Sequence, residues 1–361
     1  AIRRTLVLYT FSSTDAQYLD NLKFFVNEGI RGSDDSNYII IQQQDGGLDS
    51  IKQLPRLPSN ARYVTHKNAC YDWGTFGWAL LQIGSGLHNY SYFVFINASV
   101  RGPYLPTYWP RGWHWSKILT TRLNSKTKLV GSTISCQCWL RDGDDPDQQR
   151  CNPHVQSYLM ATDQARTLHN TSSCNAGVGL QLLLKDRRVF RCHKSMSSAI
   201  YDAEVGASRV ILGAGFTIDS LMLRYRDLDW TDKRNWDCNA RTNPTSEFSY
   251  DGIQINPLEV LFVKVKSFHL ESEWVSTQLA VTYDRWRLNQ GVPGGVSTNE
   301  MINFEKNLKM ARMAKMRLRG NDCFDFDYFR DNLPVDSKGL RRNALWDLFV
   351  EQDQFSGRPF R

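Results

Sequence analysis

The chain has 361 residues, enough for one large α/β domain with an appendage or for two domains. Hydrophobic residues make up 41% and charged residues 22%, ordinary values for a globular protein with a sizeable core. Lys and Arg outnumber Asp and Glu by 44 to 37, but this surplus is scattered and contains no long basic run. We therefore expect a site for an anionic ligand and no nucleic-acid partner. No stretch approaches the roughly 20 apolar residues of a membrane span.

The cysteines and glycosylation sequons bear on the cellular compartment. Eight cysteines allow up to four disulfides in about 105 connectivities, so no pairing is predicted. Cys136 and Cys138 are too close together for a usual zinc knuckle, which favours disulfides over metal binding. Sequons stand at Asn89, Asn97 and Asn170. Together these features predict a glycoprotein of the secretory pathway, in the Golgi or ER lumen. The start at Ala1 without Met allows for an N-terminal membrane anchor outside this chain.

The first hundred residues alternate predicted strands and helices. Short apolar runs predict buried strands at 6–9, 38–41, 62–64 and 92–96, and helical spacing predicts helices at 15–28 and from about 73 to 84. Alternation at intervals of 25 to 35 residues is typical of right-handed βαβ units. The predicted fold class is therefore α/β, with a mostly parallel sheet flanked by helices.

The remainder of the chain is less regular. We expect a helix ending near 123, strands at 129–134, 158–161 and 260–265, and a mobile polar loop at 141–153. The stretch 291–296, which reads GVPGGV, is a predicted linker. It divides a domain at 1–290 from a C-terminal helical extension at 291–361 that packs on it. Ser297 and Glu300 have capping-box spacing for a long basic helix running to Arg319.

Small polar side chains follow the strand at 92–96. Asn97 and Ser99 come directly after it, and Arg101 stands two positions further on. Ligands of open α/β sheets bind beyond the carboxyl ends of such strands. Asn and Ser can hydrogen-bond sugar hydroxyls, and Arg101 can neutralise a departing diphosphate. The segment therefore predicts a site for a sugar and a phosphate. A simple turn at the strand end is the alternative.

A second informative segment runs from 201 to 218. Asp202 and Glu204 stand where a helix is predicted to start, Gly215 can close that helix, and a strand follows. A carboxylate on rigid structure can remove the proton of an acceptor hydroxyl. The alternative is that both carboxylates only complement the helix dipole.

This pattern resembles the GT-A glycosyltransferases, in which an acidic residue opens a helix that ends in "aGy" and a strand follows. Four segments, in this order, are similar to bacterial rhamnan-synthesis F-type enzymes and their uncharacterised algal and fungal relatives: 71–74 (YDWG), 96–103 (INASVRGP), 154–157 (HVQS) and 204–208 (EVGAS). The resemblance covers about residues 5–265. It implies a GT-A-like, Rossmann-like fold and inverting transfer of a hexosyl or pentosyl group. The donor would be a nucleotide sugar and the acceptor a glycan or glycoprotein.

The resemblance also implies roles for single residues. Glu204 is the predicted base, with Asp202 as the runner-up. Asp72 would touch the nucleotide or hold a donor-binding loop, although capping of the helix near 73 explains it equally well. Asp45 would contact the base of the nucleotide, although a Gly-rich turn is the alternative. Asn97, Ser99 and Arg101 complete the predicted donor site.

The predicted acceptor side is less sharply defined. By the resemblance, His154 and Gln156 would lie there. Trp113 and Trp115 could wall the acceptor groove by stacking on sugar faces, although loop or core packing explains such residues too.

The chain departs from the GT-A pattern at the metal site. GT-A enzymes usually carry Asp-x-Asp where this chain has Asn97-Ala98-Ser99, and that motif binds Mn²⁺ or Mg²⁺ with the sugar diphosphate. Asn and Ser are poor ligands for a hard divalent cation, so we predict metal-independent transfer with no required cofactor. The missing motif also supports an alternative, a non-catalytic carbohydrate- or nucleotide-sugar-binding protein on a degenerate transferase fold. A hydrolase of phosphorylated sugars would need a nucleophile or metal cluster that the sequence does not offer.

Overall fold

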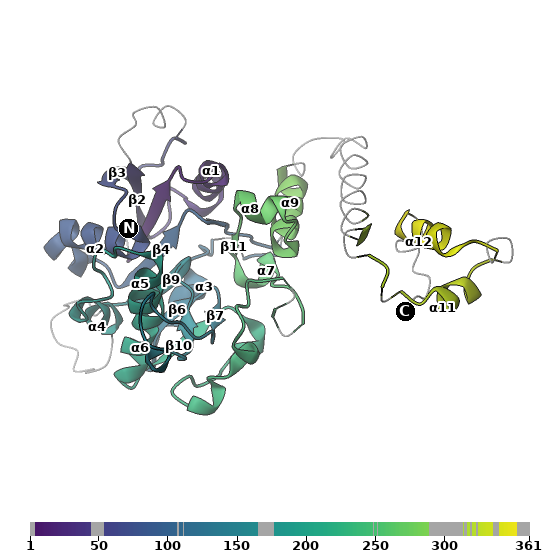
Figure 1. Ribbon diagram of the computed structural model, residues 1–361. Coiled ribbons are helices and arrows are strands. Elements are labelled where there is room, and N and C mark those ends of the chain that lie inside the picture. Colours follow the sequence, from purple (N-terminus) through teal and green to yellow (C-terminus); the bar gives the residue numbers. More distant parts are fainter. Residues whose placement is uncertain are drawn as a thin grey trace. The chain divides into compact units, whose positions relative to one another are not determined.

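The computed structural model describes residues 4–44, 54–164 and 177–288, apart from 107, 111, 248 and 251, together with parts of 313–351. The chain divides into two compact units, residues 1–284 and 285–361, which are described separately (Figure 1). In the second unit, α11 (Phe326–Asp331) and α12 (Arg342–Glu351) share a small core. The helix predicted to start at Ser297 lies almost entirely outside the described residues.

A seven-stranded sheet forms the centre of the first unit, in the order β10-β6-β9-β4-β1-β2-β3. β9 runs antiparallel to β4 and β6, and the other pairs in this sheet are parallel. The predicted fold class, α/β with a mostly parallel sheet flanked by helices, is thus confirmed. The strands are β1 (Thr5–Ser12), β2 (Ser36–Gln44), β3 (Ala61–Lys67), β4 (Tyr92–Asn97), β6 (Thr127–Gly131), β9 (Leu159–Asp163) and β10 (Thr217–Ser220).

The alternation of side chains along β1 shows why its apolar run is continuous. Leu6 and Leu8 belong to the core that contains Phe76 of α2 (Tyr71–Ile83). Val7 and Tyr9 point to the opposite face, with Phe25 of α1 (Gln17–Gly29). Both faces of the strand are buried, as expected for a central strand of a parallel sheet. The shorter helices α3 (Lys117–Thr120) and α4 (Gly179–Lys185) add to the two cores.

The helix that carries the two candidate carboxylates begins earlier than predicted. α5 (Met196–Ser198), the π-helical turn η4 (Ala199–Glu204) and α6 (Val205–Gly213) follow one another without a break. Ser195 caps the start, and its side chain accepts a hydrogen bond from the Ser198 N–H. Asp202 and Glu204 therefore lie inside the helical stretch. The prediction that they occupy its first turn, where the helix dipole favours anions, is wrong.

Two short strand pairs complete the carboxyl edge of the sheet. β5 (Val100–Arg101) pairs antiparallel with β11 (Val263–Lys264), and β7 (Ile134–Ser135) pairs with β8 (His154–Val155). The remaining helices are α7 (Pro257–Val260), α8 (Ser267–Glu271) and α9 (Val275–Leu288), and the short helical turns are η2 (Gly84–Asn89), η3 (Pro146–Gln148), η5 (Leu223–Tyr225), η6 (Lys233–Asn235) and η7 (Cys238–Arg241). Among the described residues, none of the helices has the length and apolarity that crossing a membrane requires.

Three disulfides join the described cysteines: Cys70–Cys192, Cys136–Cys238 and Cys138–Cys151. The last one closes the polar loop at 141–153, whose ends also pair through the backbone at 139 and 150. The loop predicted to be mobile is therefore fixed at its base. Disulfides are expected of an oxidising compartment.

Candidate functional site

Polar side chains from three elements meet beyond the carboxyl ends of β1 and β4. The Thr10 hydroxyl donates to Asp72 Oδ1 (2.8 Å), and Asn97 Nδ2 donates to Asp72 Oδ2 (3.0 Å). Asn97 Oδ1 accepts from the backbone N–H of Ser99 (3.1 Å) and from its hydroxyl. Three of the predicted donor-site residues, Asp72, Asn97 and Ser99, thus form one hydrogen-bonded cluster.

Asp72 occupies the first turn of α2, but both of its carboxylate oxygens are bonded across the sheet edge. Burial raises the pKa of Asp72, and the hydrogen bonds from Thr10 and Asn97 offset only part of that rise. The pKa of Asp72 is raised further by the negative charge of Glu204 and lowered by the positive charge of Lys266. The Asp72 carboxylate is therefore within electrostatic reach of both groups.

Glu204 reaches the same edge because β9 runs antiparallel. Leu159, at the start of β9, pairs with Ile96, at the end of β4. The residues just before β9 therefore lie beside the Asn97 turn. Ser157, one of them, donates its backbone N–H (3.1 Å) and its hydroxyl to Glu204 Oε2. Ser157 thus holds one oxygen of the carboxylate. The Glu204 side chain is 16% exposed, so the carboxylate stays accessible.

Of the predicted acceptor residues, His154 lies beside Glu204, with 3.9 Å between His154 Nε2 and Glu204 Oε1. Its ring is buried, and burial lowers its pKa, so the imidazole is neutral at neutral pH. Gln156 is also buried, and it accepts a hydrogen bond from Thr133 (2.8 Å) and donates one to Asn243 (3.2 Å). Only His154 thus lies beside Glu204, and a role of either residue in acceptor binding stays a prediction.

The two tryptophans predicted to line an acceptor groove differ in burial. Trp115 is 1% exposed, donates to the Gly29 carbonyl (2.8 Å) and packs against Phe25 and Phe262. Its predicted place in an acceptor groove is wrong, because the ring fills the core. Trp113 is half exposed, and its role stays a prediction. Asp45 lies outside the described residues.

Arg101 is buried and turned toward α1 and α9. Its guanidinium forms an ion pair with Asp284 (2.8 Å) and donates to Asn21 (2.9 Å) and Gln17 (3.4 Å). These partners occupy the charge that was predicted to neutralise a leaving diphosphate. The structure corrects that prediction, because Arg101 fastens the segment after β4 to its neighbours.

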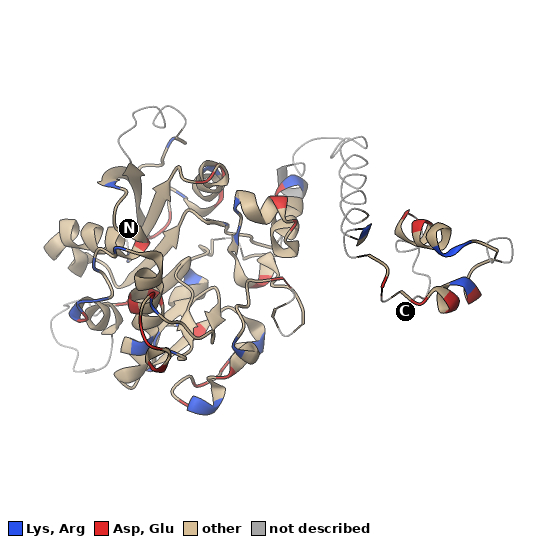
Figure 2. Cartoon of the chain, in the orientation of Figure 1, with Lys and Arg blue, Asp and Glu red and all other residues tan. Residues whose placement is uncertain are grey.

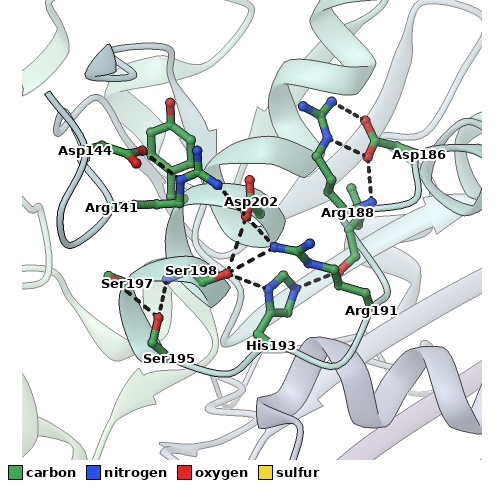
Figure 3. A network of polar contacts seen from close by, with 12 residues as sticks. Arg141, Asp144, Asp186, Arg188, Arg191, His193, Ser195, Ser197, Ser198 and Asp202 are labelled. Carbon is green, nitrogen blue, oxygen red and sulfur yellow. Dashed lines mark hydrogen bonds and ion pairs between the residues drawn. The ribbon is translucent and has the colours of Figure 1, made fainter. Parts of the chain in front are cut away.

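Asp202 belongs to a different cluster, shown in Figure 3. Its carboxylate is 1% exposed and lies close to nitrogens of Arg191 (2.8 Å), Arg141 (3.6 Å) and Arg150 (3.9 Å). The Ser198 hydroxyl also donates to it (3.3 Å). A buried carboxylate surrounded by guanidinium groups has no free face for an acceptor. Asp202 as the alternative base is therefore a prediction that the structure corrects.

Sequence reasoning missed two lysines, Lys264 and Lys266, on and just after β11. The antiparallel pairing of β11 with β5 sets Lys264 opposite Val100. The next residue, Val265, donates its N–H to the Ser99 carbonyl (3.0 Å). Lys264 Nζ lies 5.8 Å from the centre of the Tyr158 ring. The run VKVK at 263–266 was the available signal, but sequence alone does not show which strand it pairs with.

The donor groups of the cluster are poorly suited to a hard divalent cation. The Asn97 side-chain oxygen is already bonded by Ser99, and the carboxylate of Asp72 has a raised pKa. Such cations prefer several ionised carboxylates. Within the described ranges, no group of three His, Cys, Asp or Glu side chains gathers as metal ligands would. Charged residues of both signs are spread over the first unit (Figure 2).

No family model matches the chain, and no curated protein does. Among solved structures, the chain is similar to the apo structure of the bifunctional glycosyltransferase WbbM, at 12% identity and a TM-score of 0.27, over 45% of this chain and 31% of that one. The chain therefore spans about a third of the length of WbbM. It is also similar to HddC from Yersinia pseudotuberculosis, at 11% identity and a TM-score of 0.27, over 44% and 76% of the two chains. Similarity at this level does not bear on function.

Proposed function

We propose that the chain is a glycosyltransferase that moves a sugar from a nucleotide-sugar donor to a glycan or glycoprotein acceptor. The observation that carries this proposal is the meeting of two groups at the carboxyl edge of the sheet. One is the Asp72–Asn97–Ser99 cluster, and the other is the accessible Glu204 carboxylate held by Ser157. Ligands of open α/β sheets bind at such edges.

The proposed reaction needs a base for the acceptor hydroxyl and attack on the donor sugar from the side opposite the phosphate. Glu204 takes the proton of the acceptor hydroxyl, whose oxygen attacks the anomeric carbon of the donor. The bond from that carbon to the phosphate oxygen breaks, and the nucleoside diphosphate leaves from the opposite side, which inverts the configuration. Ser157 holds one carboxylate oxygen in place, and the buried neutral His154 packs 3.9 Å from the other.

The proposal includes metal independence and a lumenal setting. The neutral Asn97 and Ser99 side chains and the raised pKa of Asp72 favour transfer without a divalent cation. The three disulfides favour an oxidising compartment, for which we propose the Golgi or ER lumen, with any membrane anchor outside this chain. The sugar is a hexosyl or pentosyl group, and the family we propose is that of the rhamnan-synthesis F-type enzymes.

A screen of nucleotide sugars tests the proposal. Thermal unfolding and nucleotide release are measured for each donor, in EDTA and in Mn²⁺. A ligand at 100 times its dissociation constant adds about 2.7 kcal/mol of stability, which is easily detected. Stabilisation and slow nucleotide release in EDTA are expected for one donor.

Three other outcomes would change the assignment. Activity that requires Mn²⁺ would refute metal independence. Binding without release, with every acceptor tried, would favour the binding-protein alternative that the absent Asp-x-Asp motif suggests. No response to any nucleotide sugar would overturn the transferase assignment.

A further inference from the structure

We propose that Lys264 and Lys266 form the diphosphate-binding part of the site, which is an inference that rests on the proposed function. In this inference the two lysines, instead of Arg101, neutralise the negative charge of the departing diphosphate. Arg101 already has Asp284 as its ion-pair partner.

The backbone around both lysines is fixed beside the donor cluster. β11 pairs with β5, and the Val265 N–H donates to the Ser99 carbonyl. On one side, the Lys264 carbonyl accepts a hydrogen bond from Thr277 (2.9 Å). On the other side, Asp15 accepts from the N–H of Ser267 (3.1 Å) and from its hydroxyl. The two lysines are thus presented by a segment that is held at both ends.

The two ammonium groups share one side of this segment. The backbone stays extended at Lys266, and residues i and i+2 of an extended chain point the same way. Consistent with this, the positive charges of Lys264 and Lys266 both lower the pKa of His269, after burial, the main cause. Lys266 acts on the Asp72 carboxylate, whereas Lys264 feels the charge of Glu204. Between them, the two lysines are therefore within electrostatic reach of both candidate functional carboxylates.

Within the described residues, neither lysine has an ion-pair partner. Lys264 lies over the Tyr158 ring, and the nearby Asp15 carboxylate is bonded to Ser267. Burial lowers the pKa of Lys264, which indicates an ammonium group that has lost water without gaining a carboxylate in contact. A doubly phosphorylated anion would supply that missing charge, and lysine is a common phosphate ligand.

The experiment measures binding of inorganic pyrophosphate, a nucleoside diphosphate and the matching nucleoside. The proteins are the wild type and the variants Lys264→Ala, Lys266→Ala and the double variant. Lys185→Ala is the matched control, because Lys185 is an exposed lysine on α4. We expect each site substitution to weaken pyrophosphate and nucleoside diphosphate binding about tenfold, which corresponds to 1.4 kcal/mol. Binding of the nucleoside, and the control, should not change.

Arginine at each position, in Lys264→Arg and Lys266→Arg, should retain much of the binding, which separates loss of charge from misfolding. Unchanged diphosphate binding in the double variant would overturn the inference, even if sugar transfer is observed. Lysine-dependent pyrophosphate binding without any sugar transfer would support the anion site and refute the proposed function. If neither pyrophosphate nor the nucleoside diphosphate binds to the wild type, the inference that Lys264 and Lys266 form an anion site is wrong.

Discussion

Glu204 and Asp202 are two carboxylates on one helical stretch, two residues apart, and they lie in opposite environments. Asp202 is 1% exposed and surrounded by Arg191, Arg141 and Arg150. Glu204 is 16% exposed and has a hydroxyl, a backbone N–H and a neutral imidazole as neighbours. The charge of Asp202 is compensated by cations and joins parts of the chain that are far apart in sequence, which is a structural role. A carboxylate held by one oxygen is available for proton transfer.

We expect substitution of Glu204, the proposed base, to have the largest effect on turnover. Glu204→Gln removes the base but keeps size and hydrogen bonding to Ser157, so turnover should fall by roughly 10²- to 10⁴-fold. Nucleotide-sugar binding and thermal stability should change little. The measurement is initial-rate kinetics of sugar transfer with the donor found in the screen.

Asp202→Asn is the matched control, since it makes the same chemical change two residues away. Its turnover per folded molecule should stay within a few-fold of wild type. If the two amide variants lose turnover equally, Glu204 has no special role and the assignment of the base is wrong.

Substitution of Asp202 should instead lower the free energy of unfolding. Asp202→Ala leaves Arg191, Arg141 and Arg150 without their shared carboxylate. Removal of one partner of a fully buried ion pair costs about 3–5 kcal/mol, and we expect the lower end of that range because Arg191 and Arg141 are partly exposed to water. Urea unfolding measures the loss of the free energy of unfolding. Glu204→Ala, tested beside it, should cost clearly less, because Glu204 has no contacting cation. A loss under about 1 kcal/mol for Asp202→Ala would contradict the structural role given to the cluster.

Removal of the Cys138–Cys151 disulfide should also lower the free energy of unfolding, by no more than Asp202→Ala does. The Cys138–Cys151 disulfide closes the loop that carries Arg141 and Arg150. Replacing both cysteines by serine should cost about 3 kcal/mol, the value of the chain-entropy model for a loop of about 15 residues. Nucleotide-sugar affinity should not change, because the loop contacts Asp202 and not Glu204. A clear rise in the dissociation constant of the nucleotide sugar, measured on folded protein, would mean that the loop takes part in binding.

The sequence predicted the central strands well, for a physical reason. β1, β2 and β4 are buried on both faces, so their apolar runs are continuous and easy to recognise. Asn97 and Ser99 were singled out by the rule that ligands bind at strand ends, and Asp72 by the family resemblance; their role in donor binding stays a prediction. Asn97 and Asp72 come together there because α2 starts beside the ends of β1 and β4.

What sequence could not supply depends on tertiary pairing and on rotation about the helix. Glu204 was ranked above Asp202 by the family resemblance alone, because nothing local shows which side of a π-helical turn each one faces. Trp115 differs from Trp113 only by burial. Lys264 gains its place from the pairing of β11 with β5, between segments more than 150 residues apart, and no pattern in either segment specifies it.

Lys264 is a half-buried lysine that, unlike the arginines around Asp202, contacts no carboxylate among the described residues, and its effect on stability should be the smallest. Burial lowers its pKa in the folded protein, whereas the unfolded chain keeps the usual value of about 10.4. Between the lowered value and about 10.4, the unfolded state binds more protons, so this group makes stability rise with pH. Below the lowered value, Lys264 is charged in both states, and the cost of burying its charge is fully present.

Lys264→Met should therefore be more stable than wild type at neutral pH, and this advantage should shrink as the pH rises toward about 10.4. Urea unfolding of both proteins at a series of pH values measures the difference, with Lys185→Met as the exposed control. Glu204 and Lys266 are the charged residues that act on Lys264, and both are present in the wild type and in the variant. An advantage that is constant or grows with pH would contradict the buried-charge explanation. In saturating pyrophosphate the advantage of Lys264→Met at neutral pH should fall by about 1.4 kcal/mol, because the wild type binds the anion about tenfold more tightly.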